Sequence, residues 1–411
     1  MQTKLWPHQQ EAIGTFMLLE KGILEMATGT GKTKTSLEIM KKLLAEGNVD
    51  LVIVIAYGND LLNQWYGELL VNLPEAGVYR WYEAYRELST YLLCGEEQSV
   101  LLLSRDAERI AECLDRLERQ RGYEYNRAHT LLVFDEVHGM GARSFRKNLQ
   151  GKIRRYRYRL GMSATPVREF DQEGNRFLEE EIGRVIYHFG LAEAIQKGIL
   201  CEFEYLPLPY RLTIEERQKK KRLIAAYESR LNQGQDMNPE ELYRDLARVN
   251  KTASDKLNQF QIYIQQNPKF LRQCIIFVET REYGLEVQKI LMHHTFRFHT
   301  YYGEDDRENL KRFADGTLDC LVTCKKISEG IDMRSVQHIV LFSSDRGLLT
   351  TTQRIGRCLR KNPEDQHKRA GILDFVCYSG KMAEEDTTAD AERKKWLEQL
   401  AKTRREANGN L

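Results

Sequence analysis

The first 190 residues alternate short, continuously apolar runs with stretches in which apolar residues recur at helical spacing. Continuous apolar runs of this length are typical of strands buried on both faces, as in a parallel sheet. Ala107–Arg119 shows the intervening helical pattern, with apolar side chains at Ile110, Leu114 and Leu117. The alternation predicts an α/β lobe, a doubly wound parallel sheet with crossover helices. The runs are Gly22–Met26, Leu51–Ala56, Val100–Leu103, Leu131–Phe134 and Tyr158–Met162.

A second series of the same kind begins at Cys274 and predicts a second doubly wound lobe. Its runs alternate with helical periodicity at Glu282–Leu291, Arg307–Phe313 and Thr351–Leu359. The expected fold class is therefore two tandem α/β lobes joined by a connecting segment. The apolar runs are Cys274–Val278, Phe296–Tyr301, Cys320–Thr323, His338–Phe342 and Ala370–Phe375.

The pattern changes between the two lobes and again near the end of the chain. The connecting segment is charged and mostly helical, and within it Glu202–Tyr210 predicts a strand. The basic run Lys219–Arg222 either contacts nucleic acid or belongs to a solvated helix face, and the second is the simpler interpretation. The expected organisation is a first lobe over 1–190, a helical accessory segment over 191–267, a second lobe over 268–380 and a charged C-terminal helix over 381–411.

A loop rich in glycine and threonine follows the first apolar run and leads into a predicted helix. Backbone N–H groups of such a loop, together with a helix N-terminus, form a site for phosphate groups. Lys32 would meet the outer phosphates, and the hydroxyl of Thr33 would hold a metal ion. Met26 stands where the strict phosphate-loop pattern has glycine, so a plain Gly/Thr-rich turn is the alternative. The predicted contacts are Thr28, Gly29, Thr30, Gly31, Lys32 and Thr33.

Two adjacent carboxylates follow the apolar run Leu131–Phe134. Parallel strands deliver the residues at their carboxyl ends to the edge of the sheet where ligands bind. Asp135 would hold Mg²⁺ on the phosphates there, and Glu136 would polarise the attacking water. The alternative, an ordinary strand-to-loop transition, does not account for the phosphate loop upstream.

Composition narrows the class of protein without identifying a partner. Apolar residues make up 42% of the 411 residues and charged residues 30%, as in ordinary globular chains. No apolar run approaches the about 18 residues that span a membrane, and the start of the chain lacks a secretory signal. We therefore expect no membrane contact and a cytoplasmic protein, or a nuclear one in a eukaryote. The net charge of +2 does not exclude nucleic acid, and the eight scattered cysteines predict reduced core thiols.

Four motifs resemble those of one family, the superfamily 2 DExH-type helicases. Asp135–His138 is similar to the DExH box, and Ala27–Thr33 to motif I, which in this family often lacks glycine at the position of Met26. Leu160–Pro166 resembles motif III and Gln353–Arg360 resembles motif VI. The motifs occur in the family's order and span nearly the whole chain. The resemblance implies two RecA-like lobes with a nucleotide site in the cleft between them.

Weaker matches fill the intervals between these motifs. Leu5–Gln9 resembles the adenine-recognising segment, although Trp6 stands where the family often has arginine. Trp65 lies in the match to motif Ia and is expected either to contact nucleic acid or to pack its helix on the sheet, and the residues favour neither. The matches are Leu61–Trp65 to motif Ia, Ser104 and Arg105 to motif Ib, Cys274–Thr280 to motif IV and Val322–Asp332 to motif V.

The resemblance implies an ATPase that uses Mg²⁺, and it assigns roles in both lobes. Arg357 and Arg360 lie one turn apart on a predicted helix and would reach the γ-phosphate from the second lobe. Gln353 would position the attacking water, and Gln9 would bind adenine. The catalytic residues are then Lys32, Glu136, Gln353, Arg357 and Arg360; the further nucleotide contacts are Gly330 and Asp332; the coupling residues are His138, Ser163 and Thr165; and the nucleic-acid contacts are Gln64, Ser104, Arg105, Thr280 and Thr323.

The form of the motifs indicates a branch of the family. His138 in the DExH box and the end of motif VI, Arg357-Cys358-Leu359-Arg360, resemble XPB-type repair helicases and type III restriction (ResIII) subunits. This implies a DNA helicase or translocase in repair, restriction or phage defence, with a nuclease or other subunits as partners. The alternatives are a double-stranded DNA translocase that never separates strands, an RNA helicase, and an ATP-gated nucleic-acid-binding scaffold.

Overall fold

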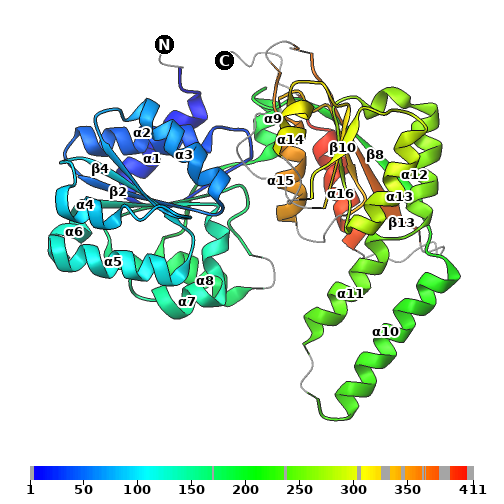
Figure 1. Ribbon diagram of the computed structural model, residues 1–411, viewed down its shortest axis with the longest axis horizontal. Helices are drawn as coiled ribbons and strands as arrows, with labels where there is room; N and C mark the ends of the chain where they lie inside the picture. The colour runs from blue at the N-terminus through cyan, green and yellow to red at the C-terminus, as the bar shows by residue number, and fades with distance from the viewer. Residues whose placement is uncertain are drawn as a thin grey trace. The chain divides into compact units, whose positions relative to one another are not determined.

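The computed structural model describes residues 4–168, 171–235, 238–302, 307–324, 334–343, 348–362, 365, 367–378 and 389–404. The chain divides into two compact units, the first ending at Ala194 and the second beginning at Ile195 (Figure 1). Each unit is built around one sheet whose paired strands all run parallel. The prediction of two tandem lobes with parallel sheets is confirmed. The finer division into four segments stays a prediction.

The sheet of the first unit contains seven strands in its described residues. They are β1 (Lys21–Met26), β2 (Leu51–Ala56), β3 (Gly77–Trp81), β4 (Ser99–Ser104), β5 (Thr130–Asp135), β6 (Tyr158–Ser163) and β7 (Val185–Phe189). Their order across the sheet is β3-β4-β2-β5-β6-β1-β7. Every residue of β2, β5 and β6 is buried, because helices cover both faces of the sheet at its centre.

Helices lie on both faces of this sheet. α2 (Lys32–Ala45) and α3 (Asn59–Asn72) cover one face, and α5 (Ala107–Arg121) and α7 (Arg143–Leu149) cover the other (Figure 1). Side chains of α5 and α7 share a core with Leu132 and Phe134 of β5. The other helices of this unit are α1 (Pro7–Leu19), α4 (Leu88–Cys94), α6 (Tyr123–His129) and α8 (Gln172–Glu181), with short 3₁₀ turns at Val137–Gly141 and Ile153–Arg155, and the division between the two units falls within α9 (Leu191–Gln196).

The hydrophobic pattern does not predict the two edge strands, β3 and β7. Both lie at the ends of the strand order, where a strand has a neighbour on one side. Their residues are mostly half-buried or exposed, and polar side chains such as Arg80 and His188 stand among the apolar ones. A continuous apolar run therefore marks the centre of a parallel sheet and misses its edges.

Among its described residues, the second unit has a sheet of six strands in the order β10-β11-β9-β12-β13-β8. All five apolar runs predicted after Cys274 coincide with strands, and the strand predicted at Glu202–Tyr210 is β8. Pro207 and Pro209 are tolerated in β8 because it lies at the edge of the sheet. The strands are β8 (Phe203–Tyr210), β9 (Cys274–Phe277), β10 (Phe298–Thr300), β11 (Cys320–Thr323), β12 (His338–Leu341) and β13 (Ala370–Cys377).

Two helices of the connecting segment, α10 (Ile214–Asn232) and α11 (Pro239–Lys251), project from the second unit as an arm (Figure 1). α10 begins with a capping box in which Thr213 and Glu216 each accept the other's backbone N–H. No side chain of α10 is buried, in keeping with a solvated face for its basic run. The remaining helices are α12 (Asp255–Gln266), α13 (Arg281–Met292), α14 (Arg307–Ala314), α15 (Leu348–Cys358) and α16 (Ala389–Ala401), with a 3₁₀ turn at Pro268–Leu271.

None of the described helices combines the length and the apolar character that crossing a bilayer requires.

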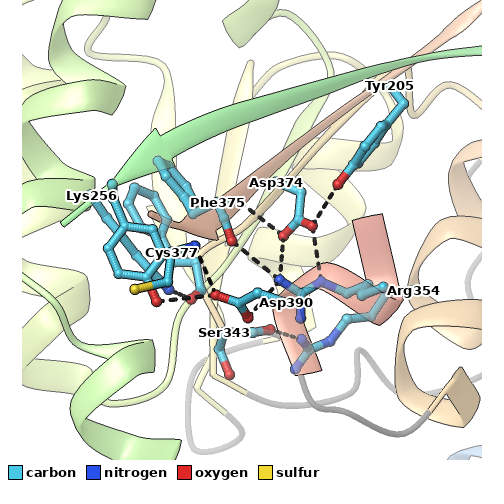
Figure 2. A network of polar contacts seen from close by, with 11 residues as sticks. Tyr205, Lys256, Ser343, Arg354, Asp374, Phe375, Cys377 and Asp390 are labelled. Atoms are coloured by element: carbon cyan, nitrogen blue, oxygen red, sulfur yellow. Dashed lines mark hydrogen bonds and ion pairs between the residues drawn. The ribbon is translucent and has the colours of Figure 1, made fainter. Parts of the chain in front are cut away.

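The final helix α16 is held to the second sheet by a buried ion pair. Arg393 donates from Nε to Oδ2 of Asp374 on β13 (2.9 Å) and from Nη2 to Oδ1 (3.2 Å), and these side chains are 1% and 0% exposed. Asp374 also accepts a hydrogen bond from the hydroxyl of Tyr205 on β8 (3.0 Å), and Arg393 donates to Asp390 (Figure 2). Each buried charge thus has several partners, which a buried ion pair needs. The helix predicted in the tail is present as α16.

A buried lysine, Lys256 of α12, lies beside this network (Figure 2). Its Nζ donates to the carbonyl of Phe342 (3.0 Å) and lies 4.6 Å from the centroid of the Tyr210 ring. Burial lowers the pKa of Lys256 from 10.5 to about 8, although the carboxylates of Asp390 and Asp374 act in the opposite direction. The ammonium form is therefore disfavoured in the folded chain.

This burial predicts a pH dependence of stability. Between about pH 8 and pH 10.5 the unfolded chain keeps a proton on Lys256 that the folded chain has released, so the lysine's contribution to stability rises with pH. We expect the free energy of unfolding of the wild type, minus that of Lys256→Met, to increase across this window. Urea unfolding at several pH values measures the difference. Lys289→Met, at an exposed position, is the control, and a Lys256→Met difference that does not change with pH would contradict the prediction.

Candidate functional site

Three neighbouring strands bring the predicted site residues of the first unit to one edge of its sheet. β6 lies between β1 and β5, with Met162 opposite both Leu24 and Asp135. Because the strands are parallel, the loops that follow them leave the sheet at the same edge. The phosphate loop after β1, Asp135 at the end of β5 and Ser163 at the end of β6 therefore lie together.

The phosphate loop owes its shape to two glycines. Gly29 and Gly31 have φ of 90° and 86°, in the left-handed region that other residues rarely adopt. A Cβ at Gly31 would lie 2.2 Å from Nε2 of Gln9, so any other residue there would have to displace the Gln9 side chain as well as adopt the left-handed backbone. The hydroxyl of Thr30 donates to the carbonyl of Ala27 (2.7 Å) and is used within the loop. α2 begins at the next residue, so a helix N-terminus adjoins the loop.

The polar groups of the loop fit a phosphate ligand. Nζ of Lys32 lies 3.3 Å from the last carbonyl of β1, across the loop. The hydroxyls of Thr28 and Thr165 are buried and have no hydrogen-bond partner among the described residues. Buried polar groups without a partner are rare in folded proteins, and phosphate oxygens would supply one. Thr33 and Asp135 provide the hydroxyl and carboxylate oxygens that suit Mg²⁺ beside phosphates.

Gln9 and His8 support this loop from α1. Nε2 of Gln9 lies 3.4 Å from two loop carbonyls, and its Oε1 accepts the backbone N–H of Trp6 (3.0 Å). Nε2 of His8 donates to the carbonyl of Thr30 (2.8 Å), and its ring stacks on Phe189. Burial lowers the pKa of His8, which favours the neutral ring. The adenine contact of Gln9 stays a prediction, and in this structure its amide braces the loop.

Asp135 is held by hydrogen bonds to both carboxylate oxygens. Oδ2 accepts the indole N–H of Trp65 (2.9 Å), and Oδ1 accepts the backbone N–H of Glu136 (2.9 Å). Burial raises the pKa of Asp135, and the nearby charge of Glu136 raises it further. The hydrogen bond from Trp65 and the positive charge of Lys32 act in the opposite direction. Lys32 therefore lies close enough to Asp135 to affect its charge.

Glu136 has an unusual backbone. Its φ and ψ are 47° and 56°, a left-handed conformation that costs a non-glycine residue about 1–3 kcal/mol and that clusters at functional sites. Arg105 holds the backbone there by donating from Nη1 to the carbonyl of Glu136 (2.9 Å). Oε2 of Glu136 accepts a hydrogen bond from Ser163 (3.4 Å) and lies 3.3 Å from Nδ1 of His138.

Ser163 joins the three predicted coupling residues into one network with Glu136. Its Oγ lies 3.1 Å from Nδ1 of His138 and accepts the backbone N–H of Thr165 (3.2 Å). Arg168 donates to the carbonyl of His138 (2.8 Å), so the loop after β6 is tied to the turn after β5. These contacts connect both loops to the carboxylate of Glu136, and the coupling role of the three residues stays a prediction.

The predicted nucleic-acid contacts of the first unit lie at or near the carboxyl edge of the same sheet. Gln64 is exposed on α3. Ser104, at the end of β4, accepts a hydrogen bond from Arg109 (3.0 Å). The guanidinium of Arg105 lies 4.7 Å from the ring centroid of Tyr57, an aromatic side chain that is 68% exposed. The nucleic-acid contacts of these three residues stay predictions. Arg105 also donates a hydrogen bond to the carbonyl of Glu136.

In the second unit, two predicted nucleic-acid contacts have structural partners. Thr280 caps α13, where its hydroxyl accepts the backbone N–H of Tyr283 (3.2 Å). Thr323 is 0% exposed, and its hydroxyl donates to the carbonyl of Tyr301 (2.8 Å). The nucleic-acid contact predicted for Thr323 is not favoured by this position, because the hydroxyl is used inside the unit.

The predicted γ-phosphate residues lie on and just after α15. Gln353 and Arg357 belong to the helix, and Arg360 follows it, pairing with Leu200 in an isolated antiparallel bridge. Gly330 and Asp332, predicted to contact the nucleotide, lie outside the described residues. The catalytic and nucleotide-binding roles in this unit therefore stay predictions.

Sequence reasoning did not find the supporting contacts of the site. Of the two alternatives left open for Trp65, packing on the sheet is correct, since the side chain is 0% exposed. Its bond to Asp135 joins residues 70 positions apart, and no local pattern signals such a pair. Arg168 lies two residues after motif III, and that proximity was the one available signal for its contact with His138.

Comparison with known families decides the class of protein. Residues 2–168 match the family described as "Type III restriction enzyme, res subunit", and residues 255–362 match "Helicase conserved C-terminal domain". The chain belongs to the superfamily 2 helicases of the ResIII and XPB-like type. The resemblance found in the sequence is thereby confirmed.

Relatives of this helicase include the DNA 3'-5' translocase XPB2 of Sulfurisphaera tokodaii, which is 22% identical over 91% of this chain and 81% of that protein. The chain spans between 48% and 63% of four other relatives.

Two solved structures share its fold. The ATP-dependent Type ISP restriction-modification enzyme LlaBIII bound to DNA has a TM-score of 0.64 at 17% identity, over 97% of this chain and 30% of that enzyme. The Pyrococcus furiosus Hef helicase domain has a TM-score of 0.60 at 14% identity, over 96% and 98%. The two units thus have the fold of tandem RecA-like lobes.

Proposed function

We propose that this helicase couples hydrolysis of Mg²⁺-ATP to movement along DNA. The observation that carries the proposal is the grouping at the edge of the first sheet. There Asp135 and Glu136 lie beside a glycine-shaped loop that contains Lys32 and the unpartnered hydroxyl of Thr28. Membership of a helicase family supports ATP as the nucleotide and a nucleic acid as the activator.

The residues of the first lobe divide the chemistry among them. Thr33 and Asp135 would hold Mg²⁺, which neutralises charge on the phosphates when bound. Lys32 and the N-terminus of α2 bind the outer phosphates. Glu136 orients the attacking water and accepts its proton. Its hydrogen bond with Ser163 transmits this change in the protonation of Glu136 to the loop after β6. The second lobe contributes Gln353, Arg357 and Arg360 around the γ-phosphate, and Gln9, Gly330 and Asp332 complete the proposed nucleotide contacts.

The names of two similar proteins favour DNA over RNA as the nucleic acid on which this helicase moves. XPB2 is named as a DNA translocase, and the restriction-modification enzyme was solved bound to DNA. The name of XPB2 also favours a second candidate, a translocase that moves on double-stranded DNA without separating its strands. The proposal also includes a partner protein, which would be a nuclease or another repair or defence subunit. It places the protein in the cytoplasm.

Hydrolysis should depend on DNA. We expect ATP turnover to rise by about tenfold or more with DNA, because closing the lobes brings in arginines that can contribute about 10³–10⁵ in rate. Phosphate release with single-stranded, double-stranded and forked DNA and with single-stranded RNA measures this. Stimulation by RNA alone would contradict the choice of DNA, and turnover that no nucleic acid changes would favour the ATP-gated scaffold.

A strand-separation assay on the forked DNA distinguishes the two DNA motors. Unwinding together with DNA-stimulated turnover supports a helicase in the strict sense. Turnover on double-stranded DNA without unwinding supports the translocase.

A further inference from the structure

Trp65 occupies an unexpected place for a residue of the segment that resembles motif Ia. It lies on α3 with its side chain 0% exposed, while its neighbour Gln64 is exposed. Its indole Nε1 donates to Oδ2 of Asp135 at 2.9 Å, and both partners are buried. Packing of the ring accounts for the burial. Packing does not explain why the indole N–H donates to a carboxylate. A buried N–H needs an acceptor, but any carbonyl or hydroxyl oxygen would serve, and here the acceptor is Asp135.

The hydrogen bonds to Asp135 restrict its carboxylate. The indole N–H of Trp65 takes Oδ2, and the backbone N–H of Glu136 takes Oδ1 (2.9 Å). Each carboxylate oxygen has two lone pairs, so one on each oxygen stays available for a further ligand. Two donors from different elements, α3 and the turn after β5, therefore fix the rotation of the carboxylate about its χ angles.

We propose that Trp65 is a positioning residue for the metal-binding carboxylate of Asp135. The inference rests on the proposed function, in which Asp135 holds Mg²⁺ beside the nucleotide. Trp65 does not touch the metal or the nucleotide. It orients the carboxylate before the ion arrives, and the cost of ordering that side chain falls on folding rather than on binding.

Trp65→Phe tests this by removing the N–H while keeping an aromatic ring. Binding of the fluorescent nucleotide mant-ADP is titrated in EDTA and at rising MgCl₂, which gives a magnesium-free affinity and a magnesium midpoint without any turnover. We expect the midpoint to rise by about tenfold, the scale seen when a residue that orients a metal ligand is removed. The affinity in EDTA should stay within about twofold, because the phosphate loop is unchanged.

Trp81→Phe is the matched control. Trp81 ends β3 in the same lobe, is 7% exposed, and has its ring beside Arg109. This variant loses the same atoms in the core of the first lobe and should keep the wild-type magnesium midpoint. An equal rise in both variants would assign the effect to packing and overturn the inference.

A measurement on the wild type covers the case in which Trp65→Phe does not fold. The chain has four tryptophans, so ¹⁵N-indole labelling gives four N–H signals, which Phe substitutions at Trp6, Trp81 and Trp396 assign by elimination. The Trp65 signal should resist exchange with water and shift when MgCl₂ is added to the ADP complex. A Trp65 signal that exchanges freely or ignores Mg²⁺ would overturn the inference.

Magnesium titrations of the wild type and of Trp65→Phe distinguish the role of Trp65 from the existence of the metal site. If Mg²⁺ strengthens mant-ADP binding equally in the wild type and in Trp65→Phe, the metal site stands and the role of Trp65 is wrong. If Mg²⁺ has no effect on mant-ADP binding in the wild type, the proposed metal site itself is wrong, and the inference falls with it.

Discussion

Replacing Glu136 with glutamine should lower ATP turnover by about 10²–10⁴-fold, the range that a general base contributes. Glutamine keeps the shape of the side chain and can still contact Ser163, but it cannot accept a proton from water. The phosphate loop and Asp135 are untouched, so nucleotide binding should be unchanged. Lys32→Ala, in contrast, should weaken binding itself, because it removes charge that faces the phosphates.

Phosphate release under DNA-saturated conditions and mant-ATP binding measure the two effects separately. Glu83→Gln is a close control, since Glu83 is an exposed glutamate of the same lobe with φ of 52°, also in the left-handed region. The same chemical change on the same kind of backbone should leave turnover unchanged. Undiminished turnover in Glu136→Gln would remove Glu136 from the catalytic assignment.

Replacing Arg393 with alanine should destabilise the second lobe by about 3–5 kcal/mol, the cost of leaving one member of a buried ion pair without its partner. Asp374 is 0% exposed and would keep only the hydroxyl of Tyr205 and the backbone N–H of Phe375 as donors. α16 would also lose its two hydrogen bonds to Asp374 of β13, and it would keep the one in which Asp390 accepts the backbone N–H of Cys377 (3.0 Å) (Figure 2).

Urea unfolding followed by circular dichroism gives the free energy of unfolding for this comparison. Lys394→Ala is the control on the same helix, because Lys394 makes a partly exposed ion pair with Glu398 at 3.8 Å. Pairs of that kind contribute about 0–1 kcal/mol. If both variants lose the same stability, the buried pair is not what holds α16 to the sheet.

In the first sheet, the sequence predicted the central strands and missed both edge strands. Central strands such as β2 and β5 are continuously apolar because helices cover them on both faces, and that pattern is visible along the chain. The edge strands β3 and β7 mix polar and apolar residues because one side has no neighbouring strand. The second sheet differs, because both of its edge strands, β10 and β8, coincide with predicted strands, β8 despite Pro207 and Pro209.

In the candidate site, the sequence predicted the residues that lie next to one another in the chain and missed the contacts that distant residues make with them. The loop around Lys32 and the Asp135–Glu136 pair are contiguous in sequence, and their chemistry follows from residue types in a fixed order. The contacts that orient them come from elsewhere, as Trp65 does for Asp135 and Arg105 for the carbonyl of Glu136. Such contacts depend on which strands are neighbours in the sheet, and no local sequence pattern predicts the order of the strands.

The left-handed backbone at Glu136 has a consequence for how this protein could be altered by selection. Asparagine or glycine adopts that conformation more easily than glutamate, so a screen for heat tolerance alone would favour them at this position. Either change would remove the carboxylate that the proposed chemistry needs. Thermal stability and the proposed ATP hydrolysis therefore favour different residues at position 136. An engineering programme that ranks variants by melting temperature would select against the glutamate that the proposed hydrolysis needs.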